Sequence, residues 1–262
     1  MDLNQHNLID WQNTYAAIWR PRRDYLRPVR QLDAVTLSHL VGIETQKQQM
    51  LANTERFITG LPANNALLWG ARGTGKSSLV KAVLNEFKER HLRLIEVEKY
   101  DLVALPEIVD QIRELPYYFI IFCDDLSFDA ADNSYKALKS ALEGSIEAPP
   151  KNVLVYATSN RRHLLPESMA DNLESRMVEG ELHYADAIEE KISLSDRFGL
   201  WLSFYSVDQD TYLAMVDEYF KQFSGDRSQL HLEAKRFALS KGSRSGRTAK
   251  QFYNFFSRGE GK

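Results

Sequence analysis

The stretch GARGTGKSS, residues 70–78, constrains the fold of this chain more than any other segment. It follows the apolar run 66–69 and precedes residues whose apolar positions recur with helical spacing. Glycines at this density let the backbone curl so that its N–H groups point at an anion, beside the N-terminus of the next helix. The pattern therefore predicts a phosphate-binding loop between a buried strand and a helix.

The loop matches the spacing G-x-x-x-x-G-K-[ST], in which the lysine reaches the β and γ phosphates and the hydroxyl ligates Mg²⁺. We therefore expect Lys76 on the phosphates and Ser77 on the metal. The residues predicted to bind the phosphates are Gly70, Ala71, Arg72, Gly73, Thr74, Gly75, Lys76, Ser77 and Ser78. The alternative is a glycine-rich turn capped by serines.

Two acids follow the apolar run 117–123. Adjacent carboxylates at a strand end repel each other, and a cation or a reacting water at this position would explain the cost. We expect Asp124 to hold Mg²⁺ and Asp125 to activate water. The alternative for the pair is a loop start or the N-cap of the next helix. Cys123, in the same run, is best explained as a small buried apolar residue.

Apolar runs alternate with amphipathic stretches between about residues 41 and 207, which predicts an α/β core with a parallel sheet between helices. The five strands are expected at 66–69, 92–97, 117–123, 152–159 and 201–207. Helical stretches are expected at 77–90, 104–115 and 134–145. The chain is thus divided into an N-terminal helical arm (1–40), a nucleotide-binding core (41–207) and an all-helical lid (208–262), with Asp208 as a helix N-cap.

Composition and charge indicate the cellular location and the surfaces that could contact a partner. The single cysteine and the absence of a readable signal peptide or membrane span lead us to expect a cytoplasmic protein. The net charge is −3, yet residues 19–30 hold five arginines against one aspartate, and residues 235–262 hold eight Lys or Arg against one Glu. Both segments are either solvated surfaces or contacts with phosphates or an acidic partner.

With the phosphate loop, the acid pair, a further apolar strand ending in Thr158-Ser159-Asn160 and a helical C-terminal region, the chain resembles the AAA+ ATPases of the P-loop NTPase superfamily. The resemblance covers about residues 38–258. Within that superfamily, the runs GARGTGKSSLVKAVLNEF and YATSNRRHLLPE are similar to a predicted bacterial AAA+ family of unassigned cellular role.

The resemblance implies roles for further residues. Val41, Gly42 and Ile43 correspond to the segment that packs on adenine. Asn160 corresponds to the polar residue that orients the attacking water, although it could also be a turn residue.

Two arginines complete the site that the resemblance implies. Arg197 corresponds to the arginine finger that enters the site of the next subunit, and a surface salt bridge is the alternative. Arg247 corresponds to the arginine through which the lid senses the γ-phosphate, and Arg244 competes for this role.

Two departures from the superfamily pattern bear on function. Most members carry Asp-Glu at the acid pair, whereas this chain has Asp-Asp, as replication initiators and helicase loaders of the same superfamily do. The segment after the second predicted strand lacks the aromatic-hydrophobic-glycine pore loop of protein unfoldases, and Tyr100 is a weak substitute.

We therefore expect a Mg²⁺-dependent ATPase that hydrolyses ATP at the subunit interfaces of a homo-oligomer and changes the conformation of a partner that the sequence does not identify. One alternative is an ATP-dependent DNA-binding protein of the loader or initiator type, which the overall acidity makes less favoured. Another is a slow ATP switch with little hydrolysis.

Overall fold

The computed structural model of the protein describes residues 9–128, 138, 139, 142, 148–162, 164 and 194–257. Seven strands within these residues form one sheet in the order β2-β1-β4-β5-β6-β3-β7. The strands are β1 (Ala16–Arg20), β2 (Tyr25–Pro28), β3 (Ala66–Gly70), β4 (Leu92–Glu96), β5 (Tyr118–Cys123), β6 (Val153–Ser159) and β7 (Leu200–Phe204). All pairings are parallel except that of β1 with β2.

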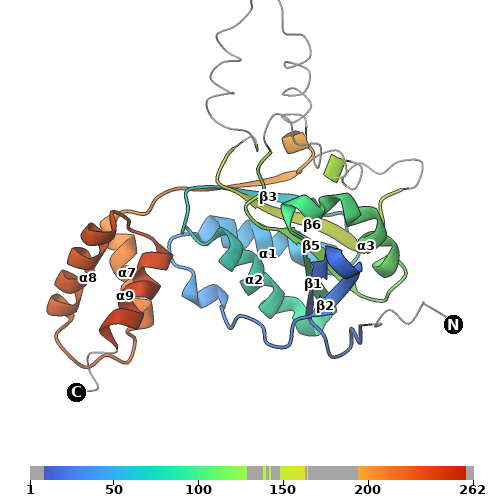
Figure 1. Cartoon of the computed structure of the whole chain (residues 1–262). Coiled ribbons are helices and arrows are strands. Elements are labelled where there is room, and N and C mark those ends of the chain that lie inside the picture. The colour runs from blue at the N-terminus through green and yellow to red at the C-terminus, as the bar shows by residue number, and fades with distance from the viewer. Residues whose placement is uncertain are drawn as a thin grey trace, which may run out of the picture.

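Helices cover both faces of the sheet, and three more form a separate layer after β7 (Figure 1). The α-helices are α1 (Glu44–Ile58), α2 (Lys76–Phe87), α3 (Leu105–Ile112), α7 (Gln209–Tyr219), α8 (Arg227–Lys241) and α9 (Gly246–Phe256). The 3₁₀ segments are η1 (Pro21–Arg23), η2 (Leu37–His39), η3 (Lys88–Arg90) and η4 (Lys99–Ala104). Most of the helix predicted at 134–145 lies outside the described residues.

The central strands are apolar throughout because each is covered on both faces. In β5, Phe119 and Ile121 point into the core shared with α3, and Ile120 and Phe122 point into the core shared with α1 and α2. All five predicted strands are present, within two or three residues of the expected ends. The predicted α/β class is thus confirmed.

The prediction of a helical arm at residues 1–40 is wrong for the part that the structure describes. Residues 16–28 form the hairpin of β1 and β2, and β1 extends the parallel sheet by pairing with β4. Trp19 lies opposite Leu26 in the hairpin register, and both side chains are buried in the core on the α3 side. Burial of this pair and hydrogen bonding to the open edge of β4 favour strands here, and the sheet has more strands than the five predicted.

The C-terminal region is all helical, as predicted, and has its own core of Tyr212, Val216, Phe220, Phe252 and neighbouring apolar residues. Asp208 caps α7 by accepting a hydrogen bond from the backbone N–H of Thr211 at 2.8 Å, which confirms the predicted N-cap. In Figure 1 this region lies beside the sheet, at the end remote from β1 and β2.

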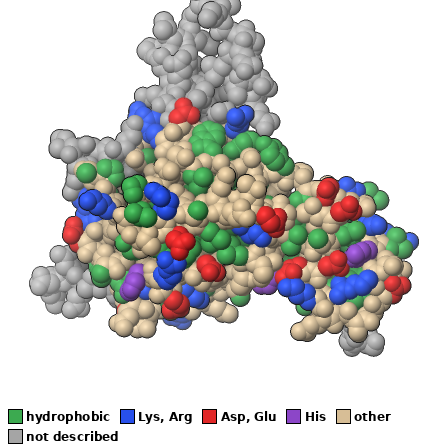
Figure 2. Space-filling view, turned by 180° about the vertical axis from the view of Figure 1, so that it is seen from behind, with side chains coloured by type: hydrophobic (Ala, Val, Ile, Leu, Met, Phe, Trp, Pro, Cys, Tyr) green, Lys and Arg blue, Asp and Glu red, His purple; other side chains and the backbone are tan. Residues whose placement is uncertain are grey.

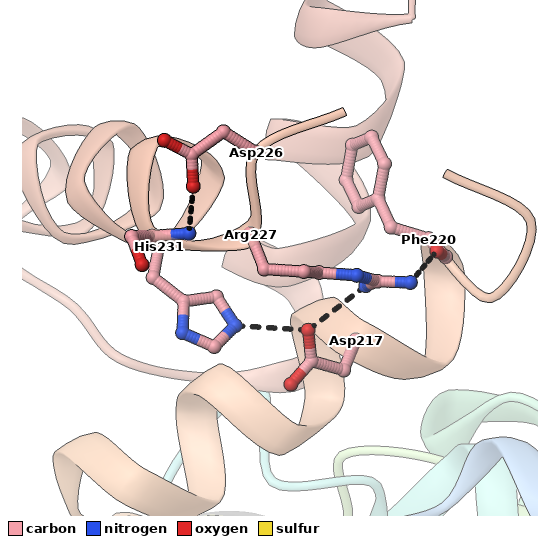
Figure 3. A network of polar contacts seen from close by, with 6 residues as sticks. Asp217, Phe220, Asp226, Arg227 and His231 are labelled. Carbon is pink, nitrogen blue, oxygen red and sulfur yellow. Dashed lines mark hydrogen bonds and ion pairs between the residues drawn. The ribbon is translucent and has the colours of Figure 1, made fainter. Parts of the chain in front are cut away.

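A polar network ties α7 to α8 on the surface of this region (Figure 3). Asp217 of α7 accepts hydrogen bonds from Arg227 at 3.1 Å and contacts the His231 ring at 2.8 Å. Arg227 also donates to the carbonyl oxygen of Phe220 at 2.7 Å, and Asp226 caps α8. The network thus links the two helices through Asp217. On the rear face of the molecule, acidic and basic side chains are interspersed over both the sheet region and the helical region (Figure 2).

Candidate functional site

The predicted phosphate loop joins β3 to α2 at the carboxyl edge of the sheet. Gly75 forms the N-cap of α2 with φ +99°, a conformation that a residue with a Cβ rarely adopts. The first turn of α2 therefore begins directly at Lys76, and its free backbone N–H groups face the loop. This arrangement provides an anion-binding helix terminus.

Lys76 lies within the loop rather than in solvent, with only 7% of its surface exposed. Its Nζ donates to the carbonyl oxygens of Gly70 at 2.8 Å and Ala71 at 2.7 Å, and to Oδ1 of Asn160 at 3.2 Å. Burial lowers the pKa of Lys76, and the nearby carboxylate of Asp124 opposes this effect. The ammonium group is thus held at the centre of the loop.

Asp124 follows β5 and faces the start of α2. The hydroxyl of Ser77 donates to its Oδ1 at 2.6 Å, and the hydroxyl of Thr158, at the end of β6, donates to the same oxygen. Three elements thus meet at one carboxylate. Thr158 is a residue that the sequence did not single out for a role of its own.

Asp125 has φ +53°, in the left-handed region that Asp and Asn tolerate better than most residues. Its backbone N–H donates to the Thr158 hydroxyl at 2.9 Å, and its carboxylate accepts from Nδ2 of Asn160. Asn160 therefore bridges Asp125 and Lys76. The structure brings the predicted acid pair, amide and lysine together.

These side chains line a cleft of about 650 Å³ between the phosphate loop and the helical region. The predicted residues in its lining are Val41, Ile43, Arg72, Gly73, Thr74, Gly75, Lys76, Ser77, Ser78, Asp124, Asp125, Asn160 and Arg247. Three residues predicted to bind the nucleotide, Gly42, Gly70 and Ala71, are outside the lining. Gly42 packs against the C-terminal region, where an added Cβ would lie 2.4 Å from the methyl group of Thr211.

The cleft has further lining residues that sequence reasoning missed. They are Asp33, Val35, His39, Leu40, Lys81, Thr158, Met215, Tyr219, Gly246 and Lys250. Five of these ten lie in η2, α7 or α9, three lie in the loops on either side of η2, and the other two lie in α2 and β6. No motif marks them. Only the folded arrangement places them at the phosphate loop.

The start of α9 touches the phosphate loop directly. Both Arg244 and Arg247 are exposed, but only Arg247 lines the cleft. An added Cβ on Gly73 would lie 2.9 Å from the hydroxyl of Ser245, the N-cap of α9. Of the two competing arginines, Arg247 is the one placed at the site.

Arg197 lies outside the cleft. It precedes β7 and therefore sits at the edge where the parallel strands begin, whereas the cleft lies where they end. Its side chain is half-buried. Arg197 could act on a nucleotide only in the site of another subunit.

A larger cavity, of about 960 Å³, lies at the end of the sheet where β5 and β6 begin. Its lining includes Leu115, Tyr118 and Asn152. None of the predicted site residues lines it. Its size exceeds that of the cleft, but the convergent lysine, hydroxyl and carboxylates belong to the cleft.

The side-chain oxygens of Ser77 and Asp124 suit Mg²⁺, which binds through one or two protein oxygens together with phosphates and waters. The Ser77 hydroxyl and an Asp124 carboxylate oxygen lie within 2.6 Å of each other and form such a pair. Among the described residues, no cluster of three or more His, Cys, Asp or Glu side chains forms an all-protein metal site.

The family described as "Protein of unknown function (DUF815)" matches residues 12–259. An uncharacterized protein of Haemophilus influenzae is 25% identical over 173 residues, which are 64% of this chain and 71% of that protein. The 26S proteasome regulatory subunit 6B homolog of Encephalitozoon cuniculi is 28% identical over 197 residues, 62% of this chain and 51% of that protein. The aligned region thus spans about half the length of the proteasome relative.

Solved structures resemble this fold at low identity. The Aeropyrum pernix ORC1 protein, solved in complex with DNA, has a TM-score of 0.58 at 16% identity, covering 80% of this chain and 58% of that chain. A mutant form of Thermotoga maritima RuvB has a TM-score of 0.50 at 13% identity, covering 84% and 72%. These likenesses show the fold. Within the described part of the chain, none of the helices has the length and apolar character needed to cross a bilayer.

Proposed function

Because this chain belongs to the DUF815 family and has the AAA+ ATPase fold, we propose that it binds ATP with Mg²⁺ in the cleft and hydrolyses it. One observation carries the proposal. The ends of β3, β5 and β6 bring Lys76, Ser77, Asp124, Asp125 and Asn160 into one hydrogen-bonded group. Phosphoryl transfer needs such a group, with a phosphate cradle, a metal ligand set and a water-positioning pair.

Ser77 and Asp124 would hold Mg²⁺, which when bound neutralises charge on the phosphate oxygens. Lys76 adds a positive charge at the centre of the loop. Thr158 holds Asp124 in place through its hydroxyl hydrogen bond. The adenine ring of ATP would pack against the apolar side of the cleft, which Val41 and Ile43 line.

Asp125 and Asn160 are suited to position the attacking water. The Asp125 carboxylate is the base that takes a proton from that water, and the Asn160 amide, which donates to Asp125, fixes the direction of the carboxylate. Arg247 approaches the same space from α9. Its charge would tie closure of the helical region to the presence of a γ-phosphate.

Arg197 completes the proposal as a group supplied to a neighbouring subunit in a homo-oligomer. Its place at the other edge of the sheet supports action in trans. Such an arginine accelerates phosphoryl transfer by roughly 10³- to 10⁵-fold in other nucleotide hydrolases. Turnover at subunit interfaces would couple hydrolysis to movement of one subunit against the next, and so to a change in a partner.

Phosphate release and the binding of a fluorescent ATP analogue test the proposal. Wild type, Lys76→Ala and Arg197→Ala are compared at high protein concentration. Lys76→Ala is expected to lose binding and turnover, and Arg197→Ala to lose turnover and keep binding. A mixture of the two variants should regain part of the activity, because Lys76→Ala subunits supply Arg197 to intact loops. Equal turnover in all three proteins would contradict an ATPase, and an inactive mixture would contradict action in trans.

A slow switch is the second candidate, and the Asp-Asp pair favours it. The Asp125 side chain is one methylene shorter than the glutamate found in most relatives of the superfamily, and it is already bonded to Asn160. Tight ATP binding by the assembled protein with phosphate release no faster than the Lys76→Ala background would identify the switch.

A further inference from the structure

A cluster of arginines occupies the hairpin of β1 and β2 and its flank. The arginine cluster consists of Arg20, Arg22, Arg23, Arg27 and Arg30. Arg22, Arg23 and Arg30 are exposed, and the other two are half-buried. Within the part of the chain that the structure describes, no hydrogen bond or ion pair joins any of these guanidinium groups to another residue.

Some arginines elsewhere in the fold have partners, whereas Arg72, Arg244 and Arg247 also have none among the described residues. Arg90 pairs with Glu55 at 3.0 Å, and Arg227 pairs with Asp217 at 3.1 Å. Like charges brought together repel, so an unpaired cluster on one hairpin lowers stability unless an anion meets it. Guanidinium is weakly hydrated and binds phosphate oxygens through two parallel N–H donors. The cluster therefore suits a polymer of phosphates.

The hairpin turn lies beside η4. β1 runs parallel to β4 with Ile18 opposite Glu96, so the turn after Arg20 is next to the segment that follows β4. Burial and the nearby carboxylate of Glu98 raise the pKa of Asp101 in η4, and the positive charge of Arg20 acts against this rise. The strand register and this electrostatic contact place Arg20, at the start of the hairpin turn, beside η4.

An aromatic ring projects from η4. The side chain of Tyr100 is 74% exposed, and the Nζ of Lys99 lies 4.9 Å from the centre of its ring. Exposed aromatic rings among cationic groups are the platforms on which single-stranded nucleic acids stack their bases. Among the acidic side chains of this region, Asp24 lies in the hairpin turn itself, and Glu96, Glu98 and Asp101 lie on or after β4. The five arginines still outnumber the single acid of the hairpin.

We propose that the arginine cluster and Tyr100 bind single-stranded nucleic acid, with guanidinium groups on the phosphates and the tyrosine ring against a base. An acidic protein would satisfy the arginines but would leave the aromatic platform unused, so nucleic acid is favoured. The surface lies four strand spacings, roughly 19 Å, from β3. Binding of nucleic acid here would be a function additional to ATP hydrolysis, and the proposal does not depend on the ATPase function.

The test is the fluorescence anisotropy of a labelled oligothymidylate titrated with the full chain, without nucleotide, at several salt concentrations. The double variant Arg22→Gln/Arg23→Gln should bind about tenfold more weakly. It should also reduce the magnitude of the slope of log affinity against log salt by about 1.4, since each phosphate contact on a single strand contributes about 0.7. Lys235→Gln/Lys241→Gln on α8 removes the same charge elsewhere and should leave both quantities unchanged. These lysines and arginines are exposed, and thermal unfolding of each variant checks that the fold is retained.

Tyr100 separates nucleic acid from an acidic protein. Tyr100→Ala should weaken oligothymidylate binding about tenfold, and Tyr100→Phe should restore it, because the ring alone stacks. Polyglutamate at equal charge concentration should not displace the oligonucleotide. The proposal fails if no binding occurs at low salt, if the hairpin and α8 double variants bind alike, or if Tyr100→Ala has no effect while polyglutamate competes fully. ATP turnover of the wild type does not enter this comparison, so either proposal can fail alone.

Discussion

The hydroxyl of Ser77, at the start of α2, lies 2.6 Å from a carboxylate oxygen of Asp124, at the end of β5. The same oxygen accepts a hydrogen bond from Thr158, which itself accepts one from the backbone N–H of Asp125. Thr158 thus links both members of the acid pair. Metal ligands need such supporting contacts to keep their orientation.

Thr158→Val keeps the shape of this side chain and removes its hydroxyl. We expect the Mg²⁺ concentration for half-maximal ATP turnover to rise by about tenfold, because Asp124 loses a supporting hydrogen bond. Thr158→Ser keeps the hydroxyl and should stay near the wild-type value. Turnover measured across a Mg²⁺ titration checks the prediction, and identical curves for the valine and serine variants would contradict it.

Asp125→Asn should abolish turnover and keep ATP binding. Asparagine tolerates the left-handed backbone at this position as well as aspartate does, so the fold is retained. The loss, at least about 100-fold, then reports the missing carboxylate base. Asp125→Glu should keep turnover but unfold at lower urea, since glutamate is less suited to φ +53°. Phosphate release and urea unfolding measure the two effects, and an active asparagine variant would rule out Asp125 as the base.

The central strands and the phosphate site could be predicted because their signals are local. Gly75 and Lys76 stand in a fixed motif, and the strand residues 118–123 are apolar on both faces. β1 and β2 could not be predicted, because residues 20–30 hold five arginines and two prolines, and their pairing depends on the distant edge of β4. Tyr219 and His39 were missed in the cleft for the same reason, since tertiary folding alone brings them there.

Tyr156→Phe tests the buried polar contact between β6 and α1. The Thr54 hydroxyl donates to the carbonyl oxygen of Met50, so the Tyr156 hydroxyl donates to Thr54, at 2.8 Å. Burial raises the pKa of Tyr156 from 10.0 to about 12. The Tyr156 hydroxyl also accepts a hydrogen bond from Nδ2 of Asn53 at 3.1 Å. Removing both hydrogen bonds should lower the free energy of unfolding at neutral pH by about 1 to 2 kcal/mol.

The pH dependence gives this prediction a second readout. The unfolded tyrosine loses its proton before the folded one does, so its stabilising effect is complete below pH 10.0 and is lost as the pH rises toward 12. The difference between wild type and Tyr156→Phe should therefore narrow over that interval. Urea unfolding at neutral and alkaline pH measures it, and a constant difference would show that the phenol does not titrate differently in the two states.

Gly73→Ala tests the contact between the phosphate loop and α9. Gly73 has φ +77°, and an added Cβ would lie 2.9 Å from the Ser245 hydroxyl that caps α9 through the N–H of Thr248. The substitution must displace the start of α9 and, with it, Arg247. We expect ATP affinity to fall about tenfold, equivalent to about 1.4 kcal/mol.

Gly242→Ala is the matched control, since Gly242 has φ +60° with no atom within 4 Å of the added Cβ. It should lose about 1 kcal/mol of stability and no ATP affinity. If both alanine variants bind ATP as the wild type does, the position of α9 against the loop has no part in nucleotide binding.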